Sequence, residues 1–342
     1  MKSLFLGLAA AIMLALAPGS VARAADAKPT PQKSGRLAVN GVDYYYEIHG
    51  RGEPVLLLHG GLGSTELFVP ALPRLAQARQ VIAVDLQGHG RSSLGSRPID
   101  LIAIGNDLSQ LLTKLGYQQV DVFGYSFGGG AGLRLAVQHP QQVRRLAIMS
   151  APFAQNGFFP EMLPQQAAVG AGMADAMKET PIYQSYAAIA PDPGQFPKLL
   201  DAMGAFMRKP YNWAEDVKTL KMPVMLIYGD SDMIRPDHIV EFYRLLGGGL
   251  RDAGWDRKTM ARNRLAILPN ATHYDISMNP AVADTVQPFL NGYAKSGTAK
   301  KLVATSGRRT EQWQARLHPA CGSTGRPKRR RISTLRCSRT AG

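Results

Sequence analysis

Residues 119–130 read Gln-Val-Asp-Val-Phe-Gly-Tyr-Ser-Phe-Gly-Gly-Gly, and the rest of the chain is organised around this stretch. Residues 120–123 are a short run of β-forming residues, and an apolar helical segment follows from Ala131. Gly124 and Gly128 leave no Cβ two positions either side of Ser126, as a very tight turn requires, and we expect a strained backbone at Ser126 itself. The stretch therefore predicts a strand, a sharp turn and a helix, with a serine hydroxyl held out at the apex.

A serine hydroxyl is a weak nucleophile at its ordinary pKa, so a reactive Ser126 needs three further groups. These are a general base, an acid that orients the base, and N–H donors for an oxyanion. The strands and loops on either side must supply them at the same edge of a sheet.

Short apolar runs alternate with segments of helical periodicity along most of the chain. Asn40-Gly41 predicts a hairpin between strands 36–39 and 43–48. The alternation predicts an α/β fold, with a mostly parallel, doubly wound sheet and an antiparallel N-terminal edge hairpin. The other expected strands are 54–58, 81–84, 120–123, 146–149, 223–228 and 265–268, and the expected helices are 65–78, 101–115, 131–138, 236–246 and 281–293.

Residues 151–219 interrupt this regularity. The segment is rich in proline, with methionine, tyrosine and phenylalanine scattered between the prolines. Because linkers lack such apolar content, we expect an insertion of short helices that forms a cap over the site. A helical satellite packed elsewhere on the domain is the alternative.

The position of each histidine along the predicted sheet limits the candidates for the base. Reacting groups in an open parallel sheet gather beyond the carboxyl ends of the strands. Of the seven histidines, His273 follows the last strand and stands at that edge, so it is the predicted base. His59 and His89 also lie at that edge, but in tight turns, where hydrogen bonding within the turn is the simpler interpretation. His139 ends a helix at the opposite edge.

Two carboxylates compete for the orienting role in the segment Tyr-Gly-Asp-Ser-Asp at 228–232. Asp230 directly follows the turn glycine, where an aspartate commonly bonds the backbone. Asp232 is two residues further on and better placed to reach an imidazole. We favour Asp232 and leave Asp230 as the alternative.

Two backbone N–H groups are the expected oxyanion donors. That of Phe127 points into the N-terminus of the new helix, where donors are unpaired and the dipole favours negative charge. The second is expected from the glycine-rich loop at 59–64, with Gly61 as the candidate. A merely tight connection after strand 54–58 would also account for that loop.

Together these residues resemble the α/β-hydrolase fold family. The hexapeptide at 124–129 is similar to its nucleophile elbow, and the chain order Ser126, Asp232, His273 matches the family's order. The loops at 59–61, 88–92 and 228–232 resemble its other landmarks. In the same family many members have glycine where this chain has Thr272. The resemblance covers about residues 36–294.

The resemblance implies a serine esterase or lipase-like member with a cap insertion. Such an enzyme would cleave a carboxylic ester or related acyl bond of a small molecule through an acyl-enzyme on Ser126. The fold also permits a lactonase, a C–C bond hydrolase, a thioesterase or an aminopeptidase, and a ligand-binding protein without turnover is the non-enzyme alternative. No cofactor or metal is expected, because the chain has no Gly-Lys-Ser/Thr phosphate loop and no His or Cys spacing typical of a metal site.

The N-terminus has the pattern of an export signal. Lys2 precedes the apolar run 4–18, and Ala22-Arg23-Ala24 fits a small-x-small cleavage site. This predicts a signal peptide over 1–25 and a periplasmic or secreted protein, with an uncleaved anchor as the alternative. A short polar segment, 26–35, would then precede the hydrolase domain, and no later segment approaches membrane-spanning length.

The net charge of +15 is concentrated at the other end. From Lys295 onward there are thirteen Lys or Arg against one acid, Glu311, whereas residues 27–294 are nearly neutral. The low apolar content of the tail 295–342 predicts disorder. Its charge suits a nucleic acid or an anionic membrane, but its single aromatic residue and the predicted export argue against a nucleic-acid partner. A non-native extension fits the change of composition equally well.

Overall fold

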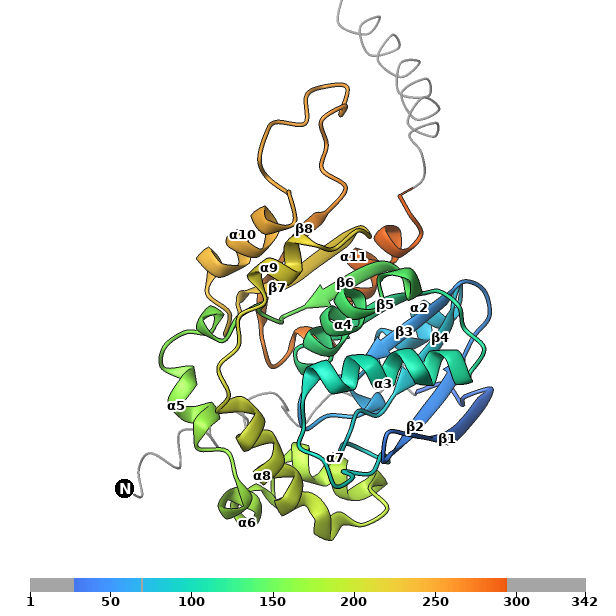
Figure 1. Cartoon of the computed structure of the whole chain (residues 1–342), viewed down its shortest axis with the longest axis vertical. Helices are drawn as coiled ribbons and strands as arrows, with labels where there is room; N and C mark the ends of the chain where they lie inside the picture. Colours follow the sequence, from blue (N-terminus) through green and yellow to red (C-terminus); the bar gives the residue numbers. More distant parts are fainter. Residues whose placement is uncertain (1–27, 69, 294–342) are drawn as a thin grey trace, which may run out of the picture. The chain divides into compact units, whose positions relative to one another are not determined.

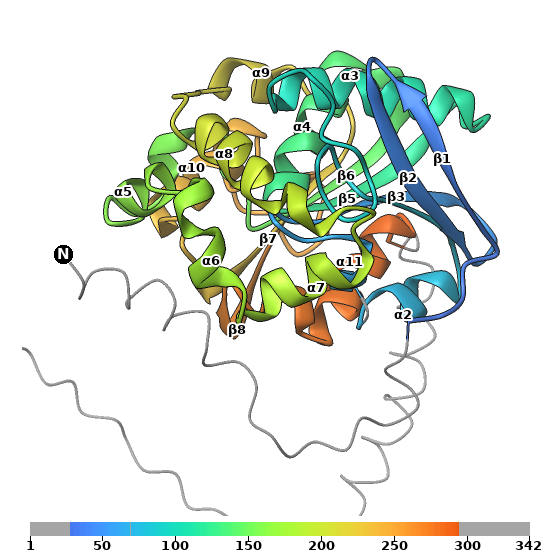
Figure 2. The same ribbon diagram turned by 90° about the horizontal axis from the view of Figure 1, so that it is seen from below.

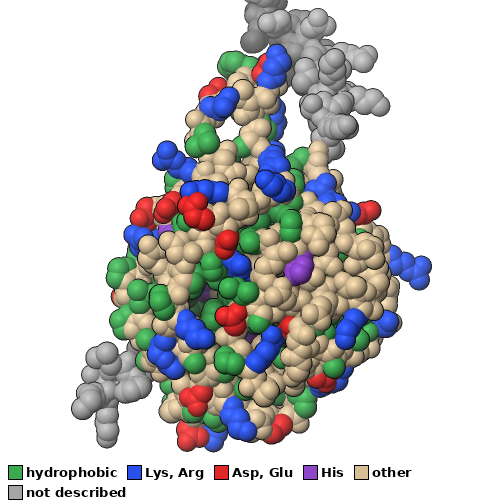
Figure 3. Space-filling model, viewed as in Figure 1, with side chains coloured by type: hydrophobic (Ala, Val, Ile, Leu, Met, Phe, Trp, Pro, Cys, Tyr) green, Lys and Arg blue, Asp and Glu red, His purple; other side chains and the backbone are tan. Residues whose placement is uncertain are grey.

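The computed structural model describes residues 28–68 and 70–293 (Figure 1). The predicted signal peptide and the predicted basic tail lie outside the described residues. Within the described part, no helix is both long enough and apolar enough to cross a membrane. Acidic and basic side chains are interspersed on the face seen in Figure 3, as the near-neutral charge of this part of the sequence leads one to expect.

Eight strands form one sheet in the order β1-β2-β4-β3-β5-β6-β7-β8. β1 and β2 pair antiparallel across Asn40 and Gly41, which both have positive φ, and β2 pairs antiparallel with β4. All other neighbours are parallel, which confirms the predicted fold class. The strands are β1 (Lys33–Val39), β2 (Val42–His49), β3 (Pro54–Leu58), β4 (Gln80–Val84), β5 (Val120–Tyr125), β6 (Val143–Met149), β7 (Val224–Ser231) and β8 (Arg264–Thr272).

Helices cover both faces of the sheet, and alternate residues of the central strands feed two cores. On β3, Leu56 and Leu58 belong to one buried cluster, and Val55 and Leu57 to the other. Figure 2 shows α3 and α4 on one side of the sheet and α2 and α11 on the other. The elements are α2 (Leu72–Ala76), α3 (Leu101–Lys114), α4 (Phe127–Gln138), α10 (Pro236–Leu245) and α11 (Ala281–Leu290), with single turns η4 (Pro140–Gln142) and η8 (Ile276–Met278).

Two helix predictions were wrong in their bounds. The segment 65–78 is not one helix but a 3₁₀ turn, η3 (Thr65–Phe68), followed by the short α2. Two prolines explain the break, because Pro70 lacks the N–H that a continuous helix needs and Pro73 fits only the first turn of a new one. Helix α4 begins at Phe127 rather than Ala131, so glycines 128–130 are helical.

The segment 151–219 consists of short helices and turns. In Figures 1 and 2, α5 to α8 lie together on one side of the molecule, whereas α9 lies near α10. Asp216 of α9 forms an ion pair with Arg134 of α4, so the end of the segment returns to the sheet domain. The elements are η5 (Gln155–Gly157), α5 (Met162–Ala167), η6 (Ala171–Met173), α6 (Ala174–Met177), α7 (Pro181–Ile189), η7 (Pro193–Gln195), α8 (Phe196–Met207) and α9 (Ala214–Lys218).

Candidate active site

Ser126 occupies a strained turn between β5 and α4. Its φ of 52° and ψ of −117° lie in a region that residues with a side chain rarely adopt. Its N–H donates to Met149 O at 2.8 Å, and its carbonyl accepts from Gly130 N–H at 3.0 Å. These bonds tie the turn to β6 on one side and to α4 on the other, so the hydroxyl is held at the carboxyl end of β5.

The two flanking glycines are required by close backbone approach. A Cβ on Gly124 would lie 2.3 Å from Gly128 O, and a Cβ on Gly128 would lie 2.3 Å from Leu58 O and 2.4 Å from His59 O. No side-chain adjustment relieves a clash with backbone oxygens. The sequence Gly-x-Ser-x-Gly therefore lets the start of α4 pack directly on the end of β3.

The structure brings Ser126, His273 and Asp232 into one chain of hydrogen bonds. Ser126 Oγ lies 3.0 Å from His273 Nε2, and His273 Nδ1 lies 3.0 Å from Asp232 Oδ1. An ionised carboxylate only accepts, so Nδ1 carries the proton and Nε2 is left to accept from the serine hydroxyl. His273 and Asp232 are each 7% exposed, so solvent has little access to the link between them, whereas Ser126 is half-buried.

Asp232 is held as the ionised acceptor by several donors. Burial alone would raise the pKa of its carboxyl, but the hydrogen bonds from His273, Ser150 and the N–H of Gly229 outweigh burial and lower it. The N–H of Ile234 also donates to Oδ1, at 3.3 Å. The carboxylate thus has a fixed orientation towards the imidazole.

Asp230 does not contact His273. Its carboxylate accepts from the N–H groups of Asn270 and Ala271, at 3.0 and 3.3 Å, and the side chain is exposed. These bonds lower the pKa of its carboxyl. Asp230 therefore joins the ends of β7 and β8 through backbone hydrogen bonds, the role that its position after the turn glycine favours, and Asp232 is the carboxylate that contacts His273.

Two supporting residues were missed by the sequence reasoning. Ser150, at the end of β6, is fully buried, and its hydroxyl donates to Asp232 Oδ2. Tyr125 donates its hydroxyl to the backbone oxygen of His273 across 148 positions of sequence. The rule that reacting groups follow strand ends identifies Ser150 as eligible, but no sequence signal reveals the contact of Tyr125.

The predicted oxyanion donors lie next to each other. A Cβ built on Gly61 would lie 3.8 Å from Phe127 Cβ, which places the loop after β3 against the first residue of α4. Phe127 is the first helical residue, so its N–H has no intrahelical acceptor. Both residues thus border the same space beside Ser126.

His59 fixes the peptide that carries the Gly61 N–H. Its Nε2 accepts from Leu86 N–H at 2.9 Å, so its Nδ1 carries the proton and donates to Gly60 O at 2.7 Å. The same oxygen accepts from Gly63 N–H at 3.1 Å. Because a trans peptide points its C=O and N–H in opposite directions, holding Gly60 O fixes the direction of the Gly61 N–H.

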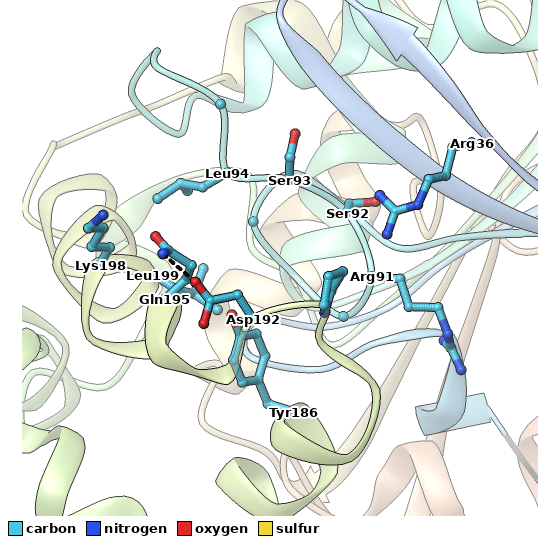
Figure 4. A pocket seen from close by; sticks show the side chains of 14 residues that line it. Arg36, Arg91, Ser92, Ser93, Leu94, Tyr186, Asp192, Gln195, Lys198 and Leu199 are labelled. Atoms are coloured by element: carbon cyan, nitrogen blue, oxygen red, sulfur yellow. Dashed lines mark hydrogen bonds between the residues drawn. The ribbon is translucent and has the colours of Figure 1, made fainter.

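A separate cavity of about 530 Å³ lies between the 88–95 loop and helices α7 and α8 (Figure 4). Leu94, Tyr186 and Leu199 form part of its wall, and Asp192 accepts from the Gln195 amide at its rim. Ser126 and His273 are not among its lining residues. Within the described residues, no cluster of His, Cys, Asp and Glu could hold a metal ion.

Comparison with known proteins identifies relatives of part of the chain. A family model described as the α/β hydrolase fold matches residues 53–182, which include Gly61, Ser126 and Phe127. RutD of Azorhizobium caulinodans, which bears the name of a carbamate hydrolase, is 36% identical over 116 residues, or 34% of this chain and 44% of that protein. A 2-hydroxymuconate semialdehyde hydrolase of Pseudomonas putida is 37% identical over 143 residues, or 35% of this chain and 46% of that protein. The chain thus spans somewhat less than half the length of these two relatives.

A solved structure extends the likeness over more of the chain. The carboxylesterase CesB from Bacillus subtilis has a TM-score of 0.60 and 19% sequence identity. The superposition covers 77% of this chain and 93% of that one. At this level of identity the likeness is one of fold.

Buried histidines beside the site make stability depend on pH. Burial lowers the pKa of His59 to about 4 and that of His89 to about 3, from an ordinary value of 6.5. The unfolded chain therefore binds protons that the folded protein does not, so the free energy of unfolding is greatest above pH 6.5 and falls as the pH drops towards 4. Urea denaturation from about pH 7 to about pH 5 measures this slope.

The variant His89→Phe provides the comparison. It keeps an aromatic ring where His89 stacks on Phe127, with ring centres 5.5 Å apart, and has no proton to gain. We expect its slope to be shallower by about 1.4 kcal/mol per pH unit. Equal slopes in the two proteins would show that His89 does not titrate differently on folding.

Proposed function

Because this chain belongs to the α/β-hydrolase fold family, we propose that it is a serine hydrolase that cleaves a carboxylic ester or related acyl bond. The observation that carries the proposal is the hydrogen-bond chain from Ser126 through His273 to Asp232, with 3.0 Å at each link. The adjoining loop at Gly61 and the helix start at Phe127 supply a place for a developing negative charge.

In the proposed mechanism, Ser126 Oγ attacks the carbonyl carbon while His273 Nε2 takes the hydroxyl proton. The oxyanion of the tetrahedral intermediate accepts from the N–H groups of Phe127 and Gly61. His273 then gives its proton to the departing alcohol, and the acyl group stays on Ser126. Water repeats the sequence on the acyl-enzyme. Asp232 stays ionised throughout and stabilises the imidazolium.

The same groups also serve lactones, thioesters, carbamates and amides, because all of them pass through a tetrahedral oxyanion. A C–C bond hydrolase would use the same serine and histidine on a carbonyl substrate. A ligand-binding protein on this fold would form at most a stoichiometric adduct. We favour esters because the part of α8 that packs against Gly61 and Phe127 is apolar, with Met203 buried and Phe206 partly buried.

Removing the nucleophile is the first test. Ser126→Ala is expected to abolish release of p-nitrophenol from short acyl esters, because no other hydroxyl is hydrogen-bonded to His273 Nε2 among the described residues. The wild-type protein and the Ser126→Ala variant are purified and assayed in the same way. Turnover that survives the substitution would remove Ser126 from the mechanism.

The two carboxylates offer a matched pair of variants. Asp232→Asn is expected to lower kcat by about 10⁴-fold, because an amide favours the wrong imidazole tautomer. Asp230→Asn makes the same change two residues away, where the side chain accepts from the N–H groups of Asn270 and Ala271 and does not contact His273, so kcat should be nearly unchanged. The assignment is reversed if the larger loss falls on Asp230→Asn.

We also propose that the protein acts in the periplasm or outside the cell, on the sequence pattern of residues 1–25 alone. Expression of the full chain in a Gram-negative bacterium should yield an exported protein whose N-terminus begins near Asp26. N-terminal sequencing of the purified protein measures this. An intact Met1 on a cytoplasmic protein would refute export.

A further inference from the structure

One face of helix α8 packs against two loops of the sheet domain and the start of α4. Leu199, Met203 and Phe206 are spaced i, i+4 and i+7, so they share a face. Leu199 lies at Gly88 after β4, with its Cδ1 3.1 Å from where a Cβ on that glycine would be. Phe206 makes an edge-to-face contact with Phe127 at the start of α4, at 5.3 Å between ring centres.

The middle residue of this face lies against Gly61, which carries the candidate oxyanion donor. Met203 Cε lies 3.1 Å from where a Cβ on Gly61 would be, and the Met203 residue is only 3% exposed. A substrate whose carbonyl oxygen accepts from Gly61 N–H would therefore have its acyl or alcohol group close to the end of this side chain. The Met203 side chain thus limits the space available to a substrate group beside Gly61.

The backbone of α8 is fixed within the cap. A Cβ on Gly204 would lie 1.9 Å from Val169 O, so the helix and the 167–171 segment are in direct backbone contact. Asp201 accepts from the N–H of Ala171 at 2.7 Å, and Arg208 donates to Ala167 O at 3.0 Å. Room beside Gly61 is therefore made more easily by the Met203 side chain, which has three rotatable bonds, than by a shift of the helix.

We propose that Met203 is a specificity-determining residue. It limits the size of the substrate arm, by which we mean the acyl or alcohol group that lies beneath α8. This rests on the proposed function, because it takes Gly61 as an oxyanion donor. Met203 has no part in the proton transfers, so shortening it changes which esters are turned over rather than whether they are. Its side chain folds aside for a short arm and obstructs a long or branched one.

The experiment measures kcat/KM for two series of esters. One varies the acyl chain from acetyl to decanoyl on p-nitrophenol, and the other varies the alcohol on a constant acetyl group. Met203→Ala is expected to raise kcat/KM for the long members relative to the short ones by about tenfold in at least one series. Met203→Phe should shift the same ratio in the opposite direction, which keeps the test decisive if the alanine variant folds poorly.

The control is Met207→Ala, one turn along the same helix. It deletes the same side chain, but Met207 has no contact with Gly61 among the close neighbours of that glycine, so the ratio should stay at the wild-type value. An active wild-type enzyme whose chain-length profile is unchanged in both Met203 variants overturns this inference alone. A wild-type protein that turns over no ester refutes the proposed function instead.

Discussion

The strained turn at Ser126 is the constraint on which the site depends. Holding a residue with a side chain at φ 52° costs about 1–3 kcal/mol, so the surrounding structure must enforce it. The turn is enforced by its backbone bonds to β6 and α4 and by the direct packing of Gly124 and Gly128 against backbone oxygens. The strain keeps the hydroxyl outside the sheet and the first N–H groups of α4 beside it.

The order of the sheet then delivers the remaining groups. β3, β5, β6, β7 and β8 are consecutive neighbours and run parallel, so their carboxyl ends form one edge. Each contributes one part of the site at or just beyond that end. In sheet order these are the Gly61 loop, Ser126, Ser150, Asp232 and His273. The arrangement of the candidate site is therefore a consequence of topology, with local hydrogen bonds setting the final orientation of each side chain.

The sheet edge also explains how much could be predicted from sequence. Ser126 and His273 follow strands whose apolar runs are plain in the sequence, so the rule on strand ends was enough to bring them together. Asp232 could be preferred to Asp230 only because it lies two residues further from the end of the strand and so is better placed to reach an imidazole. Tyr125 and Ser150 could not be assigned, because their roles are set by partners far along the chain. The same limit applies to Met203, whose contact with Gly61 depends on how α8 packs.

The proposed function depends first on the activation of Ser126 as a nucleophile by His273. Reaction of the purified protein with diisopropyl fluorophosphate tests this activation. In that reaction the serine oxygen bonds to phosphorus and fluoride leaves. Mass spectrometry of the digested protein then locates the adduct. We expect a single diisopropylphosphoryl group on Ser126, formed far more slowly when His273 is replaced by alanine. No adduct, or one on another residue, would contradict it.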